Sequence, residues 1–528
     1  MSRYRCLFFL CIILSIIFIV TINTSFRWYQ IPLTTSTTTT TNKMKMNEYN
    51  QKLVIKNDPD YDRFLINQMT EQTTTTTTTT MINITNQSSG KKKRKNQLLR
   101  HYSLILNENF NQLPWFMPNG TLRPSNNNNN DLILWPEEMT VNDDKSMNDR
   151  IINQLMYIPN NYDEQQFYPK GHRSLKKILL AFGKQSWPGL PMGRQIFIED
   201  KCPVNACFIM SNKALIDKAD AVIFKDRFIW PSKGRPSIKQ IWILFLLESP
   251  LHTQVFSSLP SNVINWTATY RHDSDIVAPY AKFFTFNNSK HQTTKNYAKG
   301  KTKKVAWFVS NCGAKNKRLE YARELSRHID VDIYGSCGEH KCPRSKANEC
   351  LDMLNNDYKF YLAFENSNCR DYITEKFYLN GLGENRPDLN IIPIVMGAHP
   401  DDYRRSSPPN SYIHVDDFES PKQLAKYLNQ LDQNDDEYNH YFEWKQQGLF
   451  INTYFWCRLC ALLHANDNDN GKPTNSYENI HHWWTSISTF NIHDNDFNNN
   501  KQPICMKNTI QHWPFLNSKS SSSLAQQK

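Results

Sequence analysis

Two common metal-binding and nucleotide-binding motifs are missing or incomplete in this 528-residue sequence. No GxGxxG segment occurs, so the glycine-rich turn of dinucleotide-binding domains is absent. Cys-x-x-Cys occurs once, at Cys457 and Cys460, whereas a four-cysteine zinc site needs a second matching pair. We therefore expect a short-loop disulfide between these two residues. A second is expected between Cys202 and Cys207, which bracket the loop PVNA.

The N-terminal apolar run lacks a following small-x-small cleavage site, which favours an uncleaved anchor over a signal peptide. Residues 6–26 contain no charged side chain and are long enough to span a bilayer, which takes about 20 helical residues. Arg3 and Arg5 place the short N-terminal end, residues 1–5, in the cytosol. We expect a transmembrane anchor of type II topology, with the rest of the chain in a lumen.

Residues 27–170 are rich in Thr and Asn runs with scattered charges. This composition cannot bury a core, so we expect a flexible stem that is open to O-glycosylation. The basic run 91–95 lies within it and contributes to a formal net charge of +12. That charge is compatible with several anionic partners and selects none of them. We expect no nucleic-acid partner.

Ten cysteines follow the expected anchor, an even number that suits disulfides in an oxidising lumen. The sequence leaves the pairing of six of them open: Cys312, Cys337, Cys342, Cys350, Cys369 and Cys505. N-glycosylation sequons agree with the same compartment. They begin at Asn83, Asn86, Asn119, Asn265 and Asn287.

Packed sequence begins near Leu175, where apolar runs of strand length alternate with polar segments. This spacing predicts an α/β domain over residues 171–300. One run, QIWILFLLE, ends at Glu248, so a carboxylate stands at the tip of a buried strand just before Pro250. Ligand sites in open α/β sheets lie at such tips. Glu248 is therefore a candidate catalytic residue, unless it merely caps a neighbouring loop.

A polar and basic linker, residues 291–304, precedes a second α/β domain, which we place over residues 301–465. VAWFVSN, CGAKN and KRLEYARELSRHI predict a strand, a loop and a helix, which together are typical of half a Rossmann-like domain. The tail, residues 466–528, is rich in Asn, Asp and Ser, and we assign it no chemistry.

The stretch Tyr358–Leu382 concentrates the polar chemistry of the second domain. Residues 358–364 predict a buried strand, ENSNCRD a polar loop, and a helix begins near Tyr372. Glu375 and Lys376 would then fall in its first turn, where free N–H groups and the helix dipole favour a pyrophosphate. The alternative is a solvated surface pair, the usual fate of adjacent charges.

The wording of this stretch, FENSNCRDYITEK, resembles the donor-site signature of the α1,3-fucosyltransferases, which transfer fucose from GDP-fucose. LLESPLHT, WPSKGRPSIKQIW and YRHDSD resemble further stretches of that family. The resemblance covers roughly residues 176–460. A signature of this length is seldom matched by chance.

The resemblance implies a role for each matching residue. It makes Glu248 the general base and Arg318 a phosphate-contacting arginine. Asn366, Tyr372 and Glu375 match positions that hold the ribose and fucose, and Lys376 acts on the pyrophosphate. Trp230, Arg235 and Gln240 shape the acceptor side or position the following strand.

A short DxD sequence, Asp273-Ser-Asp275, looks like the metal motif of another glycosyltransferase architecture. It lies within the YRHDSD stretch, and the resembled family needs no metal bound at DxD. We therefore expect a structural role between domains or a position facing the acceptor. No cofactor is expected beyond the donor substrate, and no essential divalent metal.

The resemblance implies a GT-B-like fold, with two Rossmann-like domains facing a cleft behind a transmembrane helix and a disordered stem. It implies an inverting enzyme of the Golgi membrane, with its catalytic domain in the lumen, which moves L-fucose in α1,3 linkage to GlcNAc of glycoprotein glycans. SYIHVDDFESPKQLAKYL looks closer to enzymes that act on the N-glycan core than on N-acetyllactosamine. The alternative is a membrane-anchored carbohydrate-binding or adhesion protein without transferase activity.

Overall fold

The computed structural model describes eight segments of the chain, residues 113–124, 132–138, 149–160, 162–164, 174–286, 295–465, 476–486 and 503–506. All of them belong to one compact unit, Asp60–Lys528. The expected anchor at residues 6–26 lies outside them, as do the sequons at Asn83, Asn86 and Asn287. Among the helices of the described segments, none has the length and apolar character to cross a membrane.

The first sheet confirms the α/β prediction for the segment that begins near Leu175. Its five parallel strands lie in the order β2 (Cys207–Met210), β1 (Lys176–Leu180), β3 (Ala221–Lys225), β4 (Ile241–Leu246) and β5 (Trp266–Thr269). Every residue of β3 and β4 is buried. Their continuous apolar runs are typical of strands covered on both faces. Glu248 follows the carboxyl end of β4.

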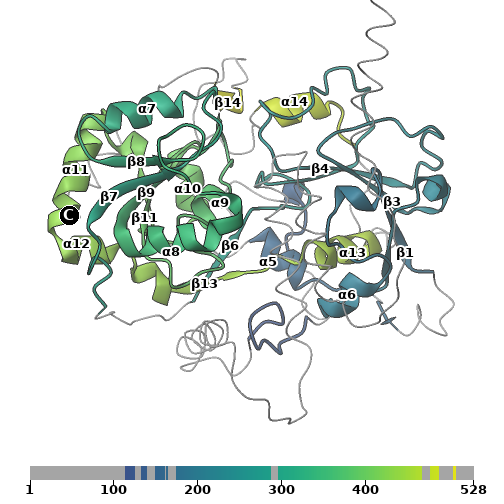
Figure 1. The fold of residues 1–528 in the computed structure, drawn as a ribbon. Coiled ribbons are helices and arrows are strands. Elements are labelled where there is room, and N and C mark those ends of the chain that lie inside the picture. The colour runs from purple at the N-terminus through teal and green to yellow at the C-terminus, as the bar shows by residue number, and fades with distance from the viewer. Residues whose placement is uncertain are drawn as a thin grey trace, which may run out of the picture. The chain divides into compact units, whose positions relative to one another are not determined.

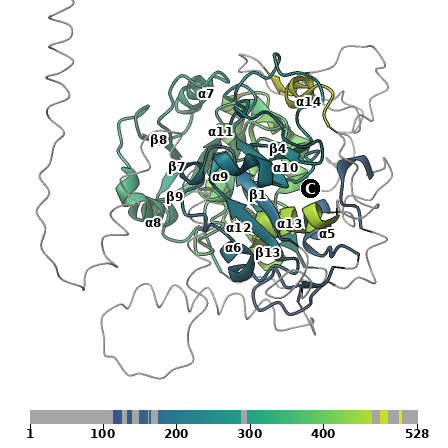
Figure 2. The same ribbon diagram turned by 90° about the vertical axis from the view of Figure 1, so that its right-hand side faces the viewer.

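Helices from distant parts of the sequence pack onto this sheet. They are α5 (Arg150–Leu155), α6 (Gln195–Glu199) and α13 (Phe455–Ala465). Figure 2 shows α13 and α6 beside β1, and α13 contacts α6, β1 and α5. The chain therefore returns to the first sheet after completing the second, so the last helix of the predicted second domain, residues 301–465, packs against the first sheet.

Part of the expected stem is packed, which corrects the prediction for residues 27–170. Trp115 and Trp135 are buried in the core, and the Trp135 ring lies 5.1 Å from that of Trp266 on β5. The Gln154 side chain donates to the carbonyls of Leu134 and Asp275 at 2.8 and 2.9 Å. The Thr and Asn runs hid these short apolar clusters, because a composition averaged over 144 positions does not resolve isolated tryptophans.

The second sheet is also parallel, in the order β12 (Ile413–His414), β11 (Ile392–Met396), β9 (Tyr358–Phe364), β7 (Lys303–Phe308) and β8 (Val331–Tyr334). Figure 1 shows it on the left. Because successive side chains of a strand point to opposite faces of the sheet, β9 contributes side chains to the cores on both faces. Phe360 and Phe364 pack in one cluster with α7 (Arg318–Leu325), α11 (Pro421–Gln433) and α12 (Asp435–His440). Tyr361 and Ala363 join the larger core with α8 (Ala347–Asp357) and α9 (Glu375–Tyr378).

Smaller elements complete the described unit. β6 (Lys282–Thr285) pairs antiparallel with β13 (Gly448–Ile451), and β10 (Asn368–Cys369) with β14 (Cys505–Met506). The remaining α-helices are α10 (Pro400–Ser406) and α14 (Ile480–Thr485). Short 3-10 helices cover Pro136–Glu138, Lys184–Ser186, Lys213–Lys218, Arg344–Lys346, Val415–Asp417 and Glu443–Gln446.

All ten cysteines after the expected anchor form disulfides, but the two predicted short loops are wrong. Cys202 pairs with Cys457 and Cys207 with Cys460. Cys457 and Cys460 lie three residues apart on α13, so both can face the first sheet, where their partners lie. The other pairs are Cys312–Cys337, Cys342–Cys350 and Cys369–Cys505.

Candidate active site

Glu248 lies where the first sheet meets the polar loop of the second domain. The Tyr372 hydroxyl donates to Glu248 Oε2 at 3.0 Å, and the Ser249 amide donates to the same oxygen at 3.2 Å. Glu248 is partly exposed, whereas Tyr372 is fully buried. Burial raises the pKa of Tyr372 well above its usual range, and the nearby Glu248 raises it further. The phenol therefore stays protonated and holds the carboxylate as a donor.

Two further contacts join the same loop to the first sheet. The hydroxyls of Ser249 and Ser367 lie 2.9 Å apart, and both residues are fully buried. His272 Nδ1 lies 2.5 Å from Asp371 Oδ2, and the side chain of Arg405 on α10 also bonds Asp371. Burial alone would raise the pKa of Asp371, but His272 and Arg405 hold it well below its usual range. The carboxylate stays charged and ties the two sides together.

Lys376 is surrounded by acceptors at the start of α9. Its Nζ lies 2.8 Å from Glu375 Oε1, 3.0 Å from Thr374 Oγ1 and 3.3 Å from Glu365 Oε2. Burial alone would lower the pKa of Lys376, but the two carboxylates raise it above its usual range. The ammonium group therefore keeps its charge, and an anion at the site would meet a fixed cation.

Glu365, which the sequence analysis did not single out, anchors this arrangement. It directly follows β9 and is fully buried. Its Oε1 accepts from the Thr374 amide at 2.8 Å and its Oε2 from the Thr374 hydroxyl at 2.9 Å. Burial raises the pKa of Glu365, against the lowering effect of Lys376. Gly397 makes room for it, because a Cβ there would lie 2.6 Å from Glu365 Cβ.

Arg318 is the first residue of α7 and reaches the end of β9. Its Nη1 donates to the Phe364 carbonyl at 2.6 Å and its Nη2 to the Asn311 carbonyl at 3.2 Å. Nearby, Asn316 donates to the Glu365 carbonyl at 2.9 Å. The Arg318 Nε and Asn316 Oδ1 are buried without a hydrogen-bond partner. Burial lowers the pKa of Arg318, which stays charged because its ordinary value is so high.

The predicted helix is shorter and starts later than expected. α9 covers only Glu375–Tyr378 and is capped by the Thr374 side chain. Four residues align too few peptide dipoles to attract an anion strongly, so the positive charge of this site rests on Lys376 and Arg318. Asn366 is nearly buried in the loop before it, and its Oδ1 accepts from the Ser367 hydroxyl at 3.1 Å.

The carboxylates of the DxD segment, Asp273 and Asp275, both accept hydrogen bonds from other groups of the protein. Asp273 forms a two-point contact with Arg271, at 2.8 Å from its Nε and 2.5 Å from its Nη2. Asp275 Oδ2 accepts from the Thr267 amide at 2.7 Å and the Tyr477 hydroxyl at 2.9 Å. Neither carboxylate is positioned to hold a metal ion without breaking these bonds.

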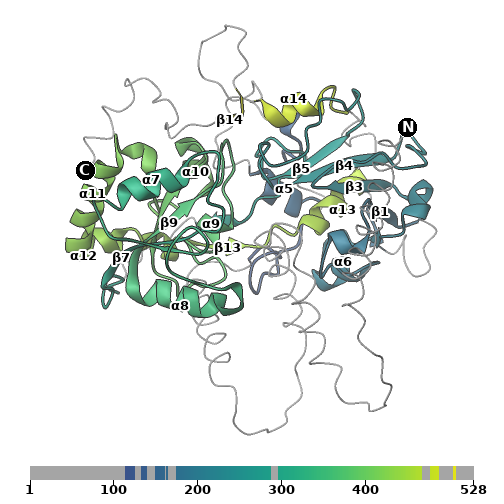
Figure 3. The same ribbon diagram turned by 45° about the horizontal axis from the view of Figure 1, so that its top comes forward.

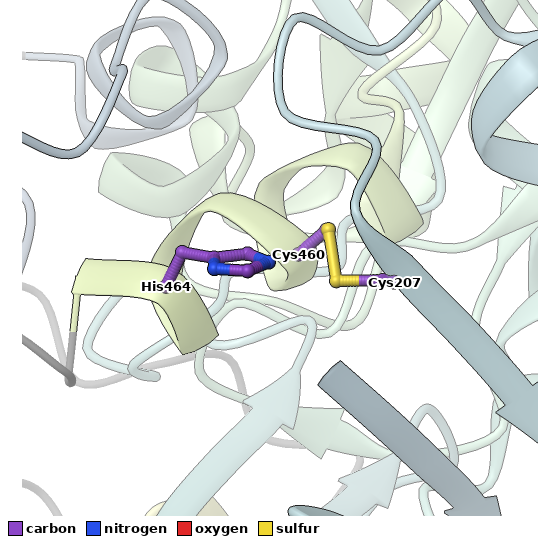
Figure 4. Close-up of side chains that lie close together, drawn as sticks. All are labelled: Cys207, Cys460 and His464. Carbon is purple, nitrogen blue, oxygen red and sulfur yellow. A yellow bond between two sulfur atoms is a disulfide. The ribbon is translucent and has the colours of Figure 1, made fainter. Parts of the chain in front are cut away.

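One cluster in the described segments has metal-ligand residue types, but its chemistry does not fit a metal. Figure 4 shows Cys460 and His464 on α13 with Cys207 on β2. The two sulfurs are joined in a disulfide, so no thiolate is available. His464 Nε2 lies 3.0 Å from the Ala206 carbonyl oxygen and donates a hydrogen bond to it. The cluster therefore has a structural role, joining α13 to β2.

Two described sequons differ in accessibility. Asn119 is exposed in a turn with φ 59°, whereas Asn265 is buried. The Asn265 Oδ1 accepts from the Trp242 amide at 2.9 Å and also bonds Arg235. Asn265 is therefore not available for glycosylation in the folded protein, contrary to the prediction.

Arg235 and Gln240 support the strand that leads to Glu248, and Trp230 is half exposed beside them.

The fold and the site define a class of protein: an α/β chain of two parallel sheets, in which a carboxylate after a strand of one sheet accepts a hydrogen bond from a tyrosine in a loop of the other. The chain belongs to glycosyltransferase family 10, the fucosyltransferases. The model "Fucosyltransferase, N-terminal" matches residues 173–281, and "Glycosyltransferase family 10 (fucosyltransferase) C-term" matches residues 298–483.

Two curated relatives agree with this family. The chain is 53% identical over 339 residues to "Glycoprotein 3-alpha-L-fucosyltransferase A" of Drosophila melanogaster, a match that covers 64% of this chain and 65% of that protein. It is 35% identical to the human "4-galactosyl-N-acetylglucosaminide 3-alpha-L-fucosyltransferase FUT6", over 58% of this chain and 87% of that one. A solved α1,3-fucosyltransferase is 14% identical with a TM-score of 0.38, over 58% of this chain and 94% of that chain.

Proposed function

We propose that this protein is an inverting α1,3-fucosyltransferase that uses GDP-β-L-fucose as donor. The observation that carries the proposal is the hydrogen bond between Tyr372 and Glu248, which joins a carboxylate at a strand tip to the loop leading to Lys376. A base and a phosphate-binding cation thereby belong to one site. Family membership and the named relatives support fucose transfer to glycans.

The proposed reaction uses Glu248 as the general base. The acceptor hydroxyl oxygen attacks the anomeric carbon of fucose, its proton passes to Glu248, and the bond to the GDP oxygen breaks with its electron pair. The β-linked donor thus gives an α-linked product. General-base help of this kind typically contributes about 10²- to 10⁴-fold.

The leaving GDP develops negative charge, and we propose that Lys376 and Arg318 stabilise it. Lys376 is held at a fixed position by Glu365, Glu375 and Thr374, so it needs no reorganisation when charge develops. We propose that Asn366 and Glu375 hold the ribose and fucose hydroxyls, and that no divalent metal is required. A GT-B-like arrangement of the two sheets is part of the same proposal.

We place the acceptor among glycoprotein glycans, with the N-glycan core GlcNAc preferred over N-acetyllactosamine. Identity to the relative named for glycoproteins is 53%, against 35% for the relative named for galactosyl-N-acetylglucosaminides. We further propose a Golgi membrane location through the N-terminal anchor. The adhesion-protein alternative is not favoured, because each relative reported above is named as a fucosyltransferase.

The test is transfer by the purified lumenal protein from GDP-fucose to a panel of acceptors. The panel contains an N-glycan with an exposed core and N-acetyllactosamine, and product linkage is read by mass spectrometry and specific fucosidases. Fucose in α1,3 linkage on the core GlcNAc supports the proposal. Transfer only to N-acetyllactosamine contradicts the acceptor assignment, and GDP-fucose binding without any transfer contradicts the enzyme.

A further inference from the structure

The C-terminal tail contains two described segments that bridge the halves of the candidate site. We name residues 476–486 and 503–506 the tail strap. The matched family segment ends at residue 483, so most of α14 lies inside it and β14 lies beyond it. Figure 3 shows α14 and β14 side by side, and the Ile504 amide donates to the Thr485 carbonyl at 3.0 Å.

One end of the tail strap is fixed to the first sheet's loops. Trp484 is buried, and its indole N–H donates to Thr253 Oγ1 at 2.8 Å. Arg271 bonds the Trp483 carbonyl and lies over the Trp483 ring at 4.3 Å. The Tyr477 hydroxyl donates to Asp275 at 2.9 Å. Trp484, Trp483 and Tyr477 of the strap therefore each contact a different residue of these loops.

The other end is fixed to the loop that carries Tyr372. Cys505 is bonded to Cys369, and β14 pairs with β10 at this point. The Arg370 amide donates to the Ile504 carbonyl at 2.9 Å. Cys369 is fully buried, so water would not replace the partners that its loop loses on detachment of the strap. Those partners are the disulfide to Cys505 and the backbone hydrogen bond to Ile504.

A chain of aromatic contacts leads from the tail strap to the base. The Trp484 ring lies 5.7 Å from Tyr270, whose ring lies 5.2 Å from Tyr372, which donates to Glu248. Tyr270 is also buried; its ring packs edge to face on Trp484 and is tilted against Tyr372, and buried ring contacts of this kind resist displacement. Both ends of the strap therefore act on the position of one phenol, that of Tyr372.

We propose that the tail strap is a positioning device for the reaction: it holds the loop 366–374 against the first sheet so that Tyr372 can orient Glu248. This inference deepens the proposed function and rests on it for its kinetic part. The strap is joined to this loop at Cys369 and Arg370, whereas Lys376 is held by Glu365, Glu375 and Thr374, so we expect detachment to lower turnover more than donor affinity.

The test compares two double variants of the full lumenal protein. Cys369→Ala with Cys505→Ala detaches the strap, and Cys342→Ala with Cys350→Ala removes a disulfide with a sequence separation of 8 as the control. We expect turnover at saturating GDP-fucose to fall about 10- to 100-fold in the first pair only. The Kd for GDP, measured by calorimetry, should stay within about threefold.

Hydrogen exchange supplies a readout that does not depend on activity. Amides of residues 366–374 should exchange faster in the Cys369→Ala/Cys505→Ala protein than in wild type. In the control their exchange should match wild type, both before and after GDP is added. Unchanged exchange, turnover within twofold of wild type, or a proportional loss of GDP affinity overturns the inference. If wild-type protein transfers no fucose, the proposed function fails, and the exchange rates still decide whether the strap orders the loop.

A milder pair covers the case in which the cysteine variant fails to fold. Trp484→Phe and Thr253→Val each remove the same hydrogen bond; Thr253→Val keeps the side-chain volume, whereas Trp484→Phe also removes part of a buried ring. Thr253→Val should lower turnover about 2- to 10-fold, and adding it to Trp484→Phe should cost no more than Trp484→Phe alone. If the losses of turnover in the two variants add in full, or if neither variant loses turnover, the Trp484–Thr253 hydrogen bond does not act through the strap.

Discussion

Tyr372 donates a hydrogen bond of 3.0 Å to Glu248 across the junction of the two sheets. The family resemblance assigns Tyr372 to the donor sugar, but here its hydroxyl contacts the proposed base. Tyr372 is buried and its pKa is raised well above the usual range, so it remains a donor at any physiological pH. Its contact indicates that orientation of the base is at least part of its task.

Tyr372→Phe tests this orienting role. The ring stays in place and the hydroxyl is lost, so we expect turnover to fall about 10- to 100-fold because Glu248 loses a fixed orientation. Affinity for GDP-fucose should stay within about threefold, as calorimetry can measure. A loss of donor affinity with turnover preserved would instead assign Tyr372 to the donor alone.

Glu365 should matter through the groups it holds. In Glu365→Ala the buried amide and hydroxyl of Thr374 lose their acceptors, so we expect weaker GDP binding and a loss of about 1–3 kcal/mol in the free energy of unfolding. Glu365→Gln keeps an acceptor for the amide and should come closer to wild type. Denaturant unfolding and calorimetry on both variants check this. Equal effects of Ala and Gln would argue against it.

The occupied carboxylates of the DxD segment lead us to predict that transfer needs no divalent metal. Asp273 and Asp275 bond protein groups, and Lys376 and Arg318 supply positive charge. Fucose transfer should therefore continue in excess EDTA at a rate within about twofold of the untreated enzyme. Activity that vanishes with chelation and returns with manganese would show that the mechanism needs a metal.

Residues before 171 should contribute to stability, because part of the expected stem is core. Trp135→Ala removes a buried ring packed on Trp266, and we expect a loss of about 3–5 kcal/mol in the free energy of unfolding. Thr121→Ser, at an exposed position of residues 113–124, keeps the Asn119 sequon; it is the control and should change stability by less than about 0.5 kcal/mol. A Trp135 variant as stable as wild type would place this segment outside the core.

Local patterns predicted the elements whose partners lie close in sequence. The apolar run 358–364, predicted as a buried strand, coincides with β9. The helix expected near Tyr372 begins at Glu375, because Thr374 caps it and contacts with Glu365 hold the preceding loop. Tertiary contacts decide such a boundary, and local propensity does not report them.

Long-range pairings account for the wrong predictions. Cys202 and Cys457 are 255 residues apart, and nothing in their local sequence indicates that α13 returns to the first sheet. Glu365 could have been found, since it ends a buried strand as Glu248 does. Asn316 carried no such signal, because only the folded chain brings its loop to the end of β9. The catalytic and donor-binding roles of the site residues stay predictions.

The assignment of Glu248 as the general base is tested most directly by measuring both donor affinity and turnover of Glu248→Gln. The amide preserves the shape of the side chain but cannot accept the proton, whereas Lys376→Ala removes a cation that acts on the pyrophosphate before and during the reaction. We predict that Glu248→Gln binds GDP-fucose nearly as wild type does and transfers essentially no fucose, while Lys376→Ala loses affinity and turnover together. A Glu248→Gln protein that keeps wild-type turnover, or that no longer binds the donor, would contradict the assignment of Glu248 as the base.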